Sequence, residues 1–449
     1  MAELRAGAAK VVINPPLGAG MAGYYQFRAC EGVLDDLHAH ALVLDDGTTR
    51  AALVTMDLIG APRELVDAVR AAVHQSGLLP GPHVMISATH AHTGPVPGRF
   101  LQTPDQPEAA AMEVHQKYLD SLPGLIASSV VAAAGKLSPV EVSGAAGDCP
   151  GVSFCRRFYM GDGTVGWNPG KLNPDITLPT GLPDPEVQAL FFEPPHVLSQ
   201  QVPALAIYAN FAMHPDVVGG TRVSADYPGA LARILSGYHG RECITLFGNG
   251  TSGNLNHLDV QWARAQRGPP EAHRLGTLLA AAIFRAEKTQ RRFPPGLLQV
   301  KSSTVLLEVP FVTREQEELA RDTVRKQQHG PLPTFMQLVH ANRLIDLAPR
   351  QGKPIEAEVQ VISLGKEAAW VAFPGEVFVE LGIALKRRSP FPHTLITTQA
   401  NGNEGYIPDR RSYAERAYEA ESARVEPGSG EKLVQAAVSL LMELHDREP

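Results

Sequence analysis

Runs of hydrophobic residues along the chain predict an alternation of strands and helices. Short, mostly apolar runs predict strands at 37–44, 51–57, 84–88, 204–211, 243–247, 297–309, 359–364, 369–373 and 394–398. Apolar residues at helical spacing predict helices at 62–75, 107–134, 225–237, 270–287, 314–326, 335–347, 377–386 and 431–444. The helix over 107–134 is expected to be interrupted near Pro123, and the Gly/Pro-rich stretch 144–195 to form long loops.

This alternation implies a layered α/β architecture, with mixed sheets flanked by helices. We find no internal repeat and no Ser-rich or charged linker, so the sequence favours one large domain over residues 1–449. At 44% hydrophobic and 19% charged residues, the chain can bury a sizeable core, which excludes disorder as its main state.

Charge and segment composition exclude several classes of function. The net charge of −7 argues against a nucleic-acid-binding protein, which usually carries a basic excess. We expect no transmembrane segment, because no stretch approaches about 18 uninterrupted apolar residues. The first residues carry no apolar core of signal-peptide length, so we expect a cytoplasmic protein. With 16 His and 4 Cys, imidazole is the more available metal ligand.

The clearest chemical signal is the pair His90 and His92, directly after the strand predicted at 84–88. Residues i and i+2 of an extended chain face the same side, so the two imidazoles would project together from a strand end. Such a pair could bind a metal ion, with one or both rings as ligands, or form a hydrogen-bonded structural pair.

Two further residues share this placement at the end of an apolar strand. His214 follows the strand at 204–211, and Glu376 follows the strand at 369–373 after Pro374-Gly375. Taken alone, His214 could be a hydrogen-bonded polar residue and Glu376 the start of the next helix. Together, two imidazoles and one carboxylate are a familiar catalytic zinc set that leaves room for water.

A glycine-rich segment, 248–257, follows the strand at 243–247. It lacks the phosphate-binding pattern GxxxxGK[ST]. It could form an amide-lined substrate or oxyanion pocket, or a plain strand-to-helix turn.

These motifs, in this order, resemble the N-terminal catalytic domain of the neutral/alkaline non-lysosomal ceramidase family. The similarity rests on the stretch THAHTGP at 89–95, NFAMH at 210–214 and PGE at 374–376, and it extends over nearly the whole chain. The resemblance implies one zinc ion bound by His90, His214, Glu376 and Tyr406, with Tyr413 as the alternative tyrosine. It also places His92 beside the metal-bound water.

The chain departs from the family pattern at two points. Asn256 occupies the position of a family serine that is important for amide cleavage, and the chain ends without the family's C-terminal immunoglobulin-like domain. We therefore expect a substrate other than ceramide. Asn256 could hydrogen-bond an oxyanion or position the substrate.

The sequence accordingly predicts a zinc site where strand ends converge and a hydrolase that cleaves an N-acyl amide bond of a small molecule. His92 is the candidate acid/base, and Asp57 and Asp226 are candidates to orient a ligand histidine. The alternatives are a zinc esterase or lactonase and a metal-containing binding protein without turnover.

Overall fold

The computed structural model describes residues 3–98, 109–195, 204–325 and 333–446. Within these ranges the protein contains three larger sheets, of four or five strands each, and several small ones. The larger sheets have the strand orders β5-β4-β3-β1-β6, β15-β13-β12-β7-β17 and β18-β19-β20-β22. The mixed α/β class expected from the sequence is therefore confirmed.

The strands of the three larger sheets are short. Their bounds are β1 Arg5–Val12, β3 His38–Asp45, β4 Arg50–Met56, β5 Val84–Ala88, β6 Ser138–Pro139, β7 Glu141–Asp148, β12 Glu186–Glu193, β13 Ala206–Phe211, β15 Ile244–Asn249, β17 Arg291–Arg292, β18 Leu298–Leu307, β19 Ile355–Leu364, β20 Ala368–Ala372 and β22 His393–Thr397. The smaller strands are β2 Gly32–Val33, β8 Phe154–Cys155, β9 Arg157–Met160, β10 Val165–Trp167, β11 Ile176–Pro179, β14 Arg222–Val223, β16 Leu255–Asn256, β21 Glu376–Val377 and β23 Tyr406–Ile407.

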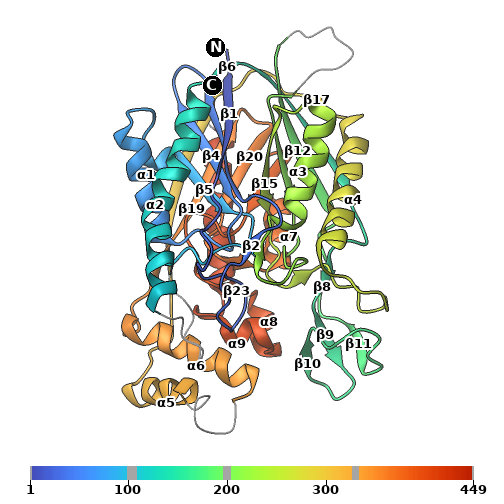
Figure 1. The fold of residues 1–449 in the computed structure, drawn as a ribbon. Helices are drawn as coiled ribbons and strands as arrows, with labels where there is room; N and C mark the ends of the chain where they lie inside the picture. Colours follow the sequence, from blue (N-terminus) through green and yellow to red (C-terminus); the bar gives the residue numbers. More distant parts are fainter. Residues whose placement is uncertain (1–2, 99–108, 196–203, 326–332, 447–449) are drawn as a thin grey trace.

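The helices include two long pairs that lie outside the sheets (Figure 1). Their bounds are α1 Arg63–Gln75, α2 Ala109–Ala134, α3 Asp226–His239, α4 Pro269–Glu287, α5 Arg314–Arg325, α6 Phe335–Leu347, α7 Val379–Arg388, α8 Arg410–Glu415, α9 Tyr418–Ser422 and α10 Ser429–His445, with 3₁₀ turns at Gly81–His83 and Ala348–Arg350. No helix among the described residues is long and apolar enough to cross a membrane.

Each larger sheet is built on the same topology. Three antiparallel strands in sequence are followed by a helix and a fourth strand parallel to the third: β1-β3-β4-α1-β5, β7-β12-β13-α3-β15 and β18-β19-β20-α7-β22. A second helix then packs on the first two strands of its unit, and these helices are α2, α4 and α10. The three units have the same order and direction of strands and helices but different amino-acid sequences. For this reason the sequence showed no internal repeat.

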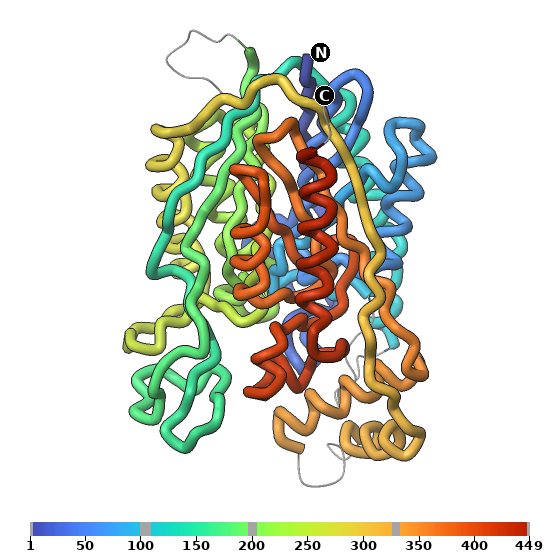
Figure 2. The backbone as a smooth tube through the Cα atoms, turned by 180° about the vertical axis from the view of Figure 1, so that it is seen from behind, coloured from blue at the N-terminus to red at the C-terminus, as the bar shows by residue number. Residues whose placement is uncertain are grey.

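The three units pack around a common core. Each sheet buries one face under its own helices, with α1 and α2 on one side and α3 and α4 on the other in Figure 1, and α10 in front of the third sheet in Figure 2. The opposite faces meet in a central cluster that includes Leu42, Leu190, Tyr208, Ile362 and Trp370. Strands of the larger sheets therefore carry apolar residues on both of their faces, which explains the continuous hydrophobic runs in the sequence.

Two sequence predictions of secondary structure are wrong. Helix α2 continues through Pro123, and the stretch 144–195 contains most of β7 and the strands β8 to β12 rather than long loops. The Gly/Pro-rich composition was misleading because β8 to β11 are two to four residues long and too short to show periodicity.

Candidate metal centre

The carboxyl ends of the parallel strands meet at one point between the three sheets. The N–H of Ala88, at the end of β5, donates to the carbonyl of Gln399 after β22 (3.1 Å), and the N–H of Thr398 donates to the carbonyl of Asn249 at the end of β15 (2.8 Å). The shared topology thus brings one strand end from each unit to the same place, where side chains can be combined from distant parts of the chain.

His90 enters this point from the first unit, two residues after β5. Its backbone is left-handed, with φ of 72°, and the N–H groups of His90 and Ala91 both donate to the carbonyl of Leu58 (2.9 and 3.1 Å). Nδ1 of His90 lies 2.6 Å from the carbonyl oxygen of Ile59, and the residue is 3% exposed. A non-glycine residue held in this conformation is uncommon and is typical of functional sites.

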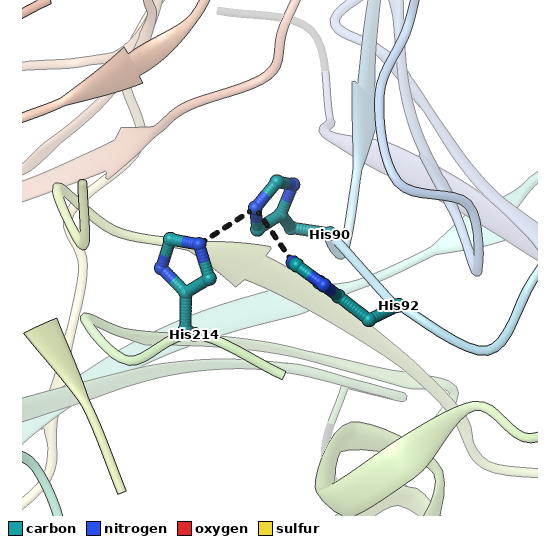
Figure 3. A group of neighbouring side chains, drawn as sticks. All are labelled: His90, His92 and His214. Atoms are coloured by element: carbon teal, nitrogen blue, oxygen red, sulfur yellow. Dashed lines mark hydrogen bonds between the residues drawn. The ribbon is translucent and has the colours of Figure 1, made fainter. Parts of the chain in front are cut away.

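His214 enters from the second unit, after β13. Its Nδ1 lies 2.9 Å from the carbonyl oxygen of Ser252, and it is 1% exposed. Nε2 of His214 lies 3.0 Å from Nε2 of His90, as Figure 3 shows. A carbonyl only accepts, so Nδ1 of each ring carries a proton, and Nε2 of each ring is the atom directed to the shared point.

Glu376 enters from the third unit, where β20 is followed by Pro374-Gly375. Oε2 of Glu376 lies 3.4 Å from Nε2 of His90 and 3.2 Å from Nε2 of His214. This oxygen is buried and has no aligned hydrogen-bond donor in the described part of the chain. Gly375 has φ of 151°, and a Cβ there would lie 2.6 Å from the carbonyl oxygen of Gly405, so this turn requires glycine.

The protonation states suit a cation at this point. Burial acts to raise the pKa of Glu376, but His90 and His214 outweigh it and hold that pKa well below its usual range. Burial, with Arg156 and His90, lowers the pKa of His214 to about 3. The site therefore offers an ionised carboxylate and a neutral imidazole, the forms that bind metal ions.

The separations between these atoms fit a tetrahedral metal site. Two nitrogen ligands bound to Zn²⁺ at about 2.0–2.1 Å in a tetrahedron lie about 3.3–3.4 Å apart. The three distances among His90, His214 and Glu376 are 3.0, 3.4 and 3.2 Å. Two imidazole nitrogens and a carboxylate oxygen at this spacing are donors that could hold a divalent metal ion.

Tyr406 lies beside Glu376, because β21 and β23 pair with Glu376 opposite Tyr406. Its hydroxyl accepts a hydrogen bond from Nη2 of Arg156 (3.0 Å). Burial raises the pKa of Tyr406 well above its usual value, and the Arg156 guanidinium opposes that effect. The hydroxyl of Tyr413 instead donates to the carbonyl of Val425 (2.8 Å), so its proton is already used.

His92 completes a group of three imidazoles whose nitrogens lie within 4.8 Å of one another. Nε2 of His92 lies 3.3 Å from Nε2 of His90, and its Nδ1 lies 3.7 Å from Oδ1 of Asp216. Figure 3 shows the ring directed toward His90. Burial lowers the pKa of His92 well below its usual value, which keeps the ring neutral and able to accept a proton.

The other predicted residues have different partners. Nδ2 of Asn256 donates to Oδ1 of Asn168 (2.8 Å), and its Oδ1 accepts from the N–H of Leu258 (3.0 Å). Among the described residues, neither Asp57 nor Asp226 forms a hydrogen bond or ion pair with a histidine ring at the centre. The rings of His90 and His214 are oriented instead by the two backbone carbonyls described above.

The two carboxylates hold backbone instead. Asp226 accepts from the N–H groups of Val217 and Val218 (2.9 and 2.8 Å), three and four residues after His214. Asp57 accepts from the N–H of His38 (2.9 Å) and from the hydroxyl of Thr89 (3.4 Å). Each therefore holds a backbone segment next to His90 or His214 rather than the histidine ring itself.

The sequence missed two residues at the centre, Arg156 and Asp216. The Arg156 side chain is buried, donates to Glu419 (2.7 Å) and the Gly253 carbonyl (2.7 Å), and holds the Tyr406 hydroxyl. Paired arginines at 156–157 in an otherwise weakly patterned stretch were the available signal. Asp216 lies two residues beyond His214, in the same segment, and could have been considered as a partner for His92.

We compared the sequence and the structure with those of known proteins. No protein-family model matches the sequence, and a search of curated proteins finds no match. Among solved structures, neutral ceramidase from Pseudomonas aeruginosa superposes with a TM-score of 0.76 at 19% identity, covering 100% of this chain and 75% of that one. A ceramidase complexed with C2 gives a TM-score of 0.74 at 18% identity, covering 100% of this chain and 76% of that one.

The chain has the neutral ceramidase fold. The predicted resemblance is thus confirmed at the level of structure over the full length of the chain. The motifs at 89–95, 210–214 and 374–376 contain the residues His90, His214 and Glu376 that meet at the centre of this chain.

Proposed function

We propose that the protein is a zinc-dependent hydrolase of the neutral ceramidase family that cleaves an N-acyl amide bond in a small molecule. The observation that carries the proposal is the convergence of two imidazole Nε2 atoms and one buried carboxylate oxygen at 3.0–3.4 Å, one from each unit. The two superposed structures are those of ceramidases, which hydrolyse an amide bond, and the fold match supports the same chemistry here.

His90, His214, Glu376 and Tyr406 are the residues that would hold the ion. The chemistry that zinc supplies in such a site is polarisation of a carbonyl and acidification of water. Imidazole and carboxylate ligands with separations near a tetrahedral edge favour zinc over magnesium or calcium, which prefer oxygen ligands.

His92 is the residue placed to move a proton. Its neutral ring lies beside the metal ligands, and Asp216 lies near its second nitrogen, an arrangement that stabilises the imidazolium formed when Nε2 accepts a proton. The same ring can then return the proton to the leaving amine. Arg156 holds the Tyr406 hydroxyl and acts through it as a positioning residue.

The side chain of Asn256 is the feature that bears on the choice between amide and ester substrates. The side chain donates to Asn168 and accepts from Leu258, and it offers no hydroxyl at the position of the family serine. This observation favours ester or lactone hydrolysis as the second candidate function. One comparison decides between them: rates on N-acyl amides, including a short-chain ceramide, against rates on esters of the same acyl groups.

The test begins with the metal. Purified protein is analysed for zinc, dialysed against a chelator and reloaded, and each form is assayed on the paired amide and ester panel. We expect one zinc ion held at this centre, activity that disappears with it and returns on reloading, and faster turnover of amides. A zinc-loaded protein that turns over neither panel would identify a binding protein and overturn the proposal.

A further inference from the structure

A second cluster of side chains that could bind a metal ion lies apart from the first centre, which is formed by His90, His214 and Glu376. His38, His40 and Asp57 each offer one ligand atom, and these atoms all lie within 4.8 Å of one another. His38 and His40 belong to β3, and Asp57 directly follows β4, the neighbouring strand. From its place in the sequence Asp57 is expected to orient a histidine of the first centre, and neither His38 nor His40 is among the predicted site residues.

The backbone of the first sheet fixes this arrangement. His38 and His40 are two residues apart in a strand, so their rings leave the same face, with centroids 5.4 Å apart. The N–H of His38 donates to Oδ2 of Asp57 (2.9 Å), and the N–H of Asp57 donates to the carbonyl of His38 (3.0 Å). The carboxylate is thereby held at the level of the two rings.

One histidine of this cluster is buried with a ring nitrogen that has no hydrogen-bond partner among the described residues. His40 is 8% exposed and Asp57 3% exposed. Nδ1 of His40 is buried and has no hydrogen-bond partner in the described part of the chain. Most buried side-chain nitrogens are hydrogen-bonded, so an unpaired one in a histidine of this cluster calls for an explanation.

All three side chains line a cavity of about 410 Å³ between the first sheet and the second unit. Its far wall comes from α3 and β15, and includes Ala232, Ser236 and Thr245. This volume leaves room for water or a small ligand beside an ion bound on the β3 side. We propose that His38, His40 and Asp57 form a second site for a divalent first-row transition-metal ion, with zinc as the best-matched ion.

The charges around the cavity are compatible with such an ion. Asp35 is engaged by the hydroxyl of Ser224 and the N–H of Ala225, and lies 3.7 Å from Arg233. Asp36 accepts from Nδ2 of Asn14. Lys10 and Arg241 also line the cavity and reduce its negative potential, so the ion depends on direct coordination rather than on a general acidic field.

The donor types limit the choice of ion. Two imidazoles and one carboxylate are the ligands of catalytic zinc and of non-haem iron sites, with the remaining positions open. Magnesium and calcium favour all-oxygen ligands and fit less well. Open positions toward the cavity allow water or a small anionic ligand to complete the coordination.

The second site lies next to the first along the chain. Asp57 accepts from the Thr89 hydroxyl, and Thr89 directly precedes His90. An ion on Asp57 therefore stabilises the segment that carries a ligand of the first centre. This contact makes a separate readout essential, because a change at one site can affect the other.

The experiment measures zinc stoichiometry after removal of loosely bound metal with a weak chelator. We expect two zinc ions per wild-type chain, and one in a His90→Ala/His214→Ala background, in which the first centre is disabled. Adding His40→Ala to that background should remove the remaining ion. His74→Ala, on an exposed face of α1, is the matched control and should retain it.

A second variant guards against misfolding. Asp57→Asn keeps an oxygen that can accept from the N–H of His38 and removes only the charge, so the sheet is preserved. In the same disabled background, zinc should raise the melting temperature of the parent but not of the Asp57→Asn variant. An ion that remains undiminished in both the His40→Ala and the Asp57→Asn variants of the disabled background would overturn the second site. Zero zinc in the double background with one in the wild type would overturn it while leaving the first centre intact.

Discussion

The protein contains the tripeptide His-Ala-His twice, at 38–40 and at 90–92, in two different backbone settings. The first copy lies inside β3, paired on one side with β1 and on the other with β4. The second copy lies beyond the end of β5, with His90 in a left-handed conformation. The rings of the first pair have centroids 5.4 Å apart, and those of the second 4.9 Å.

The difference shows what a strand end adds to a pair of histidines. Inside a ladder, both rings project from one sheet face and meet only what that sheet and its cover provide, here Asp57 and a cavity. Beyond the ladder, the chain turns and the ring of His90 reaches side chains from the other two units. A short motif therefore identifies candidate ligands only. Its position in the sheet determines how many other units can place side chains beside it.

The largest expected effect is loss of a ligand at the strand-end copy. His90→Ala removes one of three donors at 3.0–3.4 Å, and we expect zinc loss and a fall in kcat/KM of at least about 10³-fold, since the Lewis acid supplies several kcal/mol. Elemental analysis and the amide panel measure both. His74→Ala is the control. A variant that kept both metal and activity would remove His90 from the site.

Tyrosine replacement comes next and separates the two candidates for the fourth ligand. Tyr406→Phe should weaken zinc affinity about 10–100-fold, the range found when a group at a metal site is lost. Tyr413→Phe is the matched change, because its hydroxyl is bound to the Val425 carbonyl and should affect stability alone. Competition with a chromophoric chelator reports zinc affinity for both. Equal losses from the two variants would contradict the assignment.

Much of the centre could be predicted from the sequence because its residues directly follow strands. His90, His214 and Glu376 each follow a recognisable apolar strand, and parallel strands joined by helices bring their carboxyl ends together. Arg156 could not be found in this way, because it lies between two short strands whose pattern carries no periodicity. The second cluster was missed for the opposite reason: its histidines lie within a strand.

Replacing Asp216 should have a smaller effect on activity than replacing His90. Asp216 provides a carboxylate beside Nδ1 of His92, and Nδ1 of His40 has no such partner in the described part of the chain. Asp216 lies near Nδ1 of His92 and also accepts from the Tyr24 hydroxyl (2.7 Å), whereas Nδ1 of His40 has no partner among the described residues. Asp216→Asn should lower kcat about 10-fold with zinc content and KM unchanged, because a proton-accepting ring loses its orienting carboxylate. Tyr24→Phe should cause a smaller fall, and Asp216→Glu should restore part of the rate. A change confined to KM would instead place Asp216 in substrate binding.

The last expected effect is on stability rather than on catalysis, and it concerns how the two histidine regions are supported. β3 is held by its ladders, whereas the segment after His214 is held by Asp226, whose carboxylate accepts from three backbone N–H groups. Burial raises the pKa of Asp226 to about 7, above its unfolded value, although those N–H groups oppose the shift. Between about pH 4 and pH 7 the folded state therefore binds the extra proton, and stability declines as pH rises through this window. The contribution of one such group to the slope of unfolding free energy is at most about 1.4 kcal/mol per pH unit. Asp226→Asn cannot titrate and should flatten the slope by that amount in denaturant unfolding of zinc-free protein. An unchanged slope would mean that Asp226 stays ionised, and that its N–H bonds outweigh burial in holding the loop beside His214.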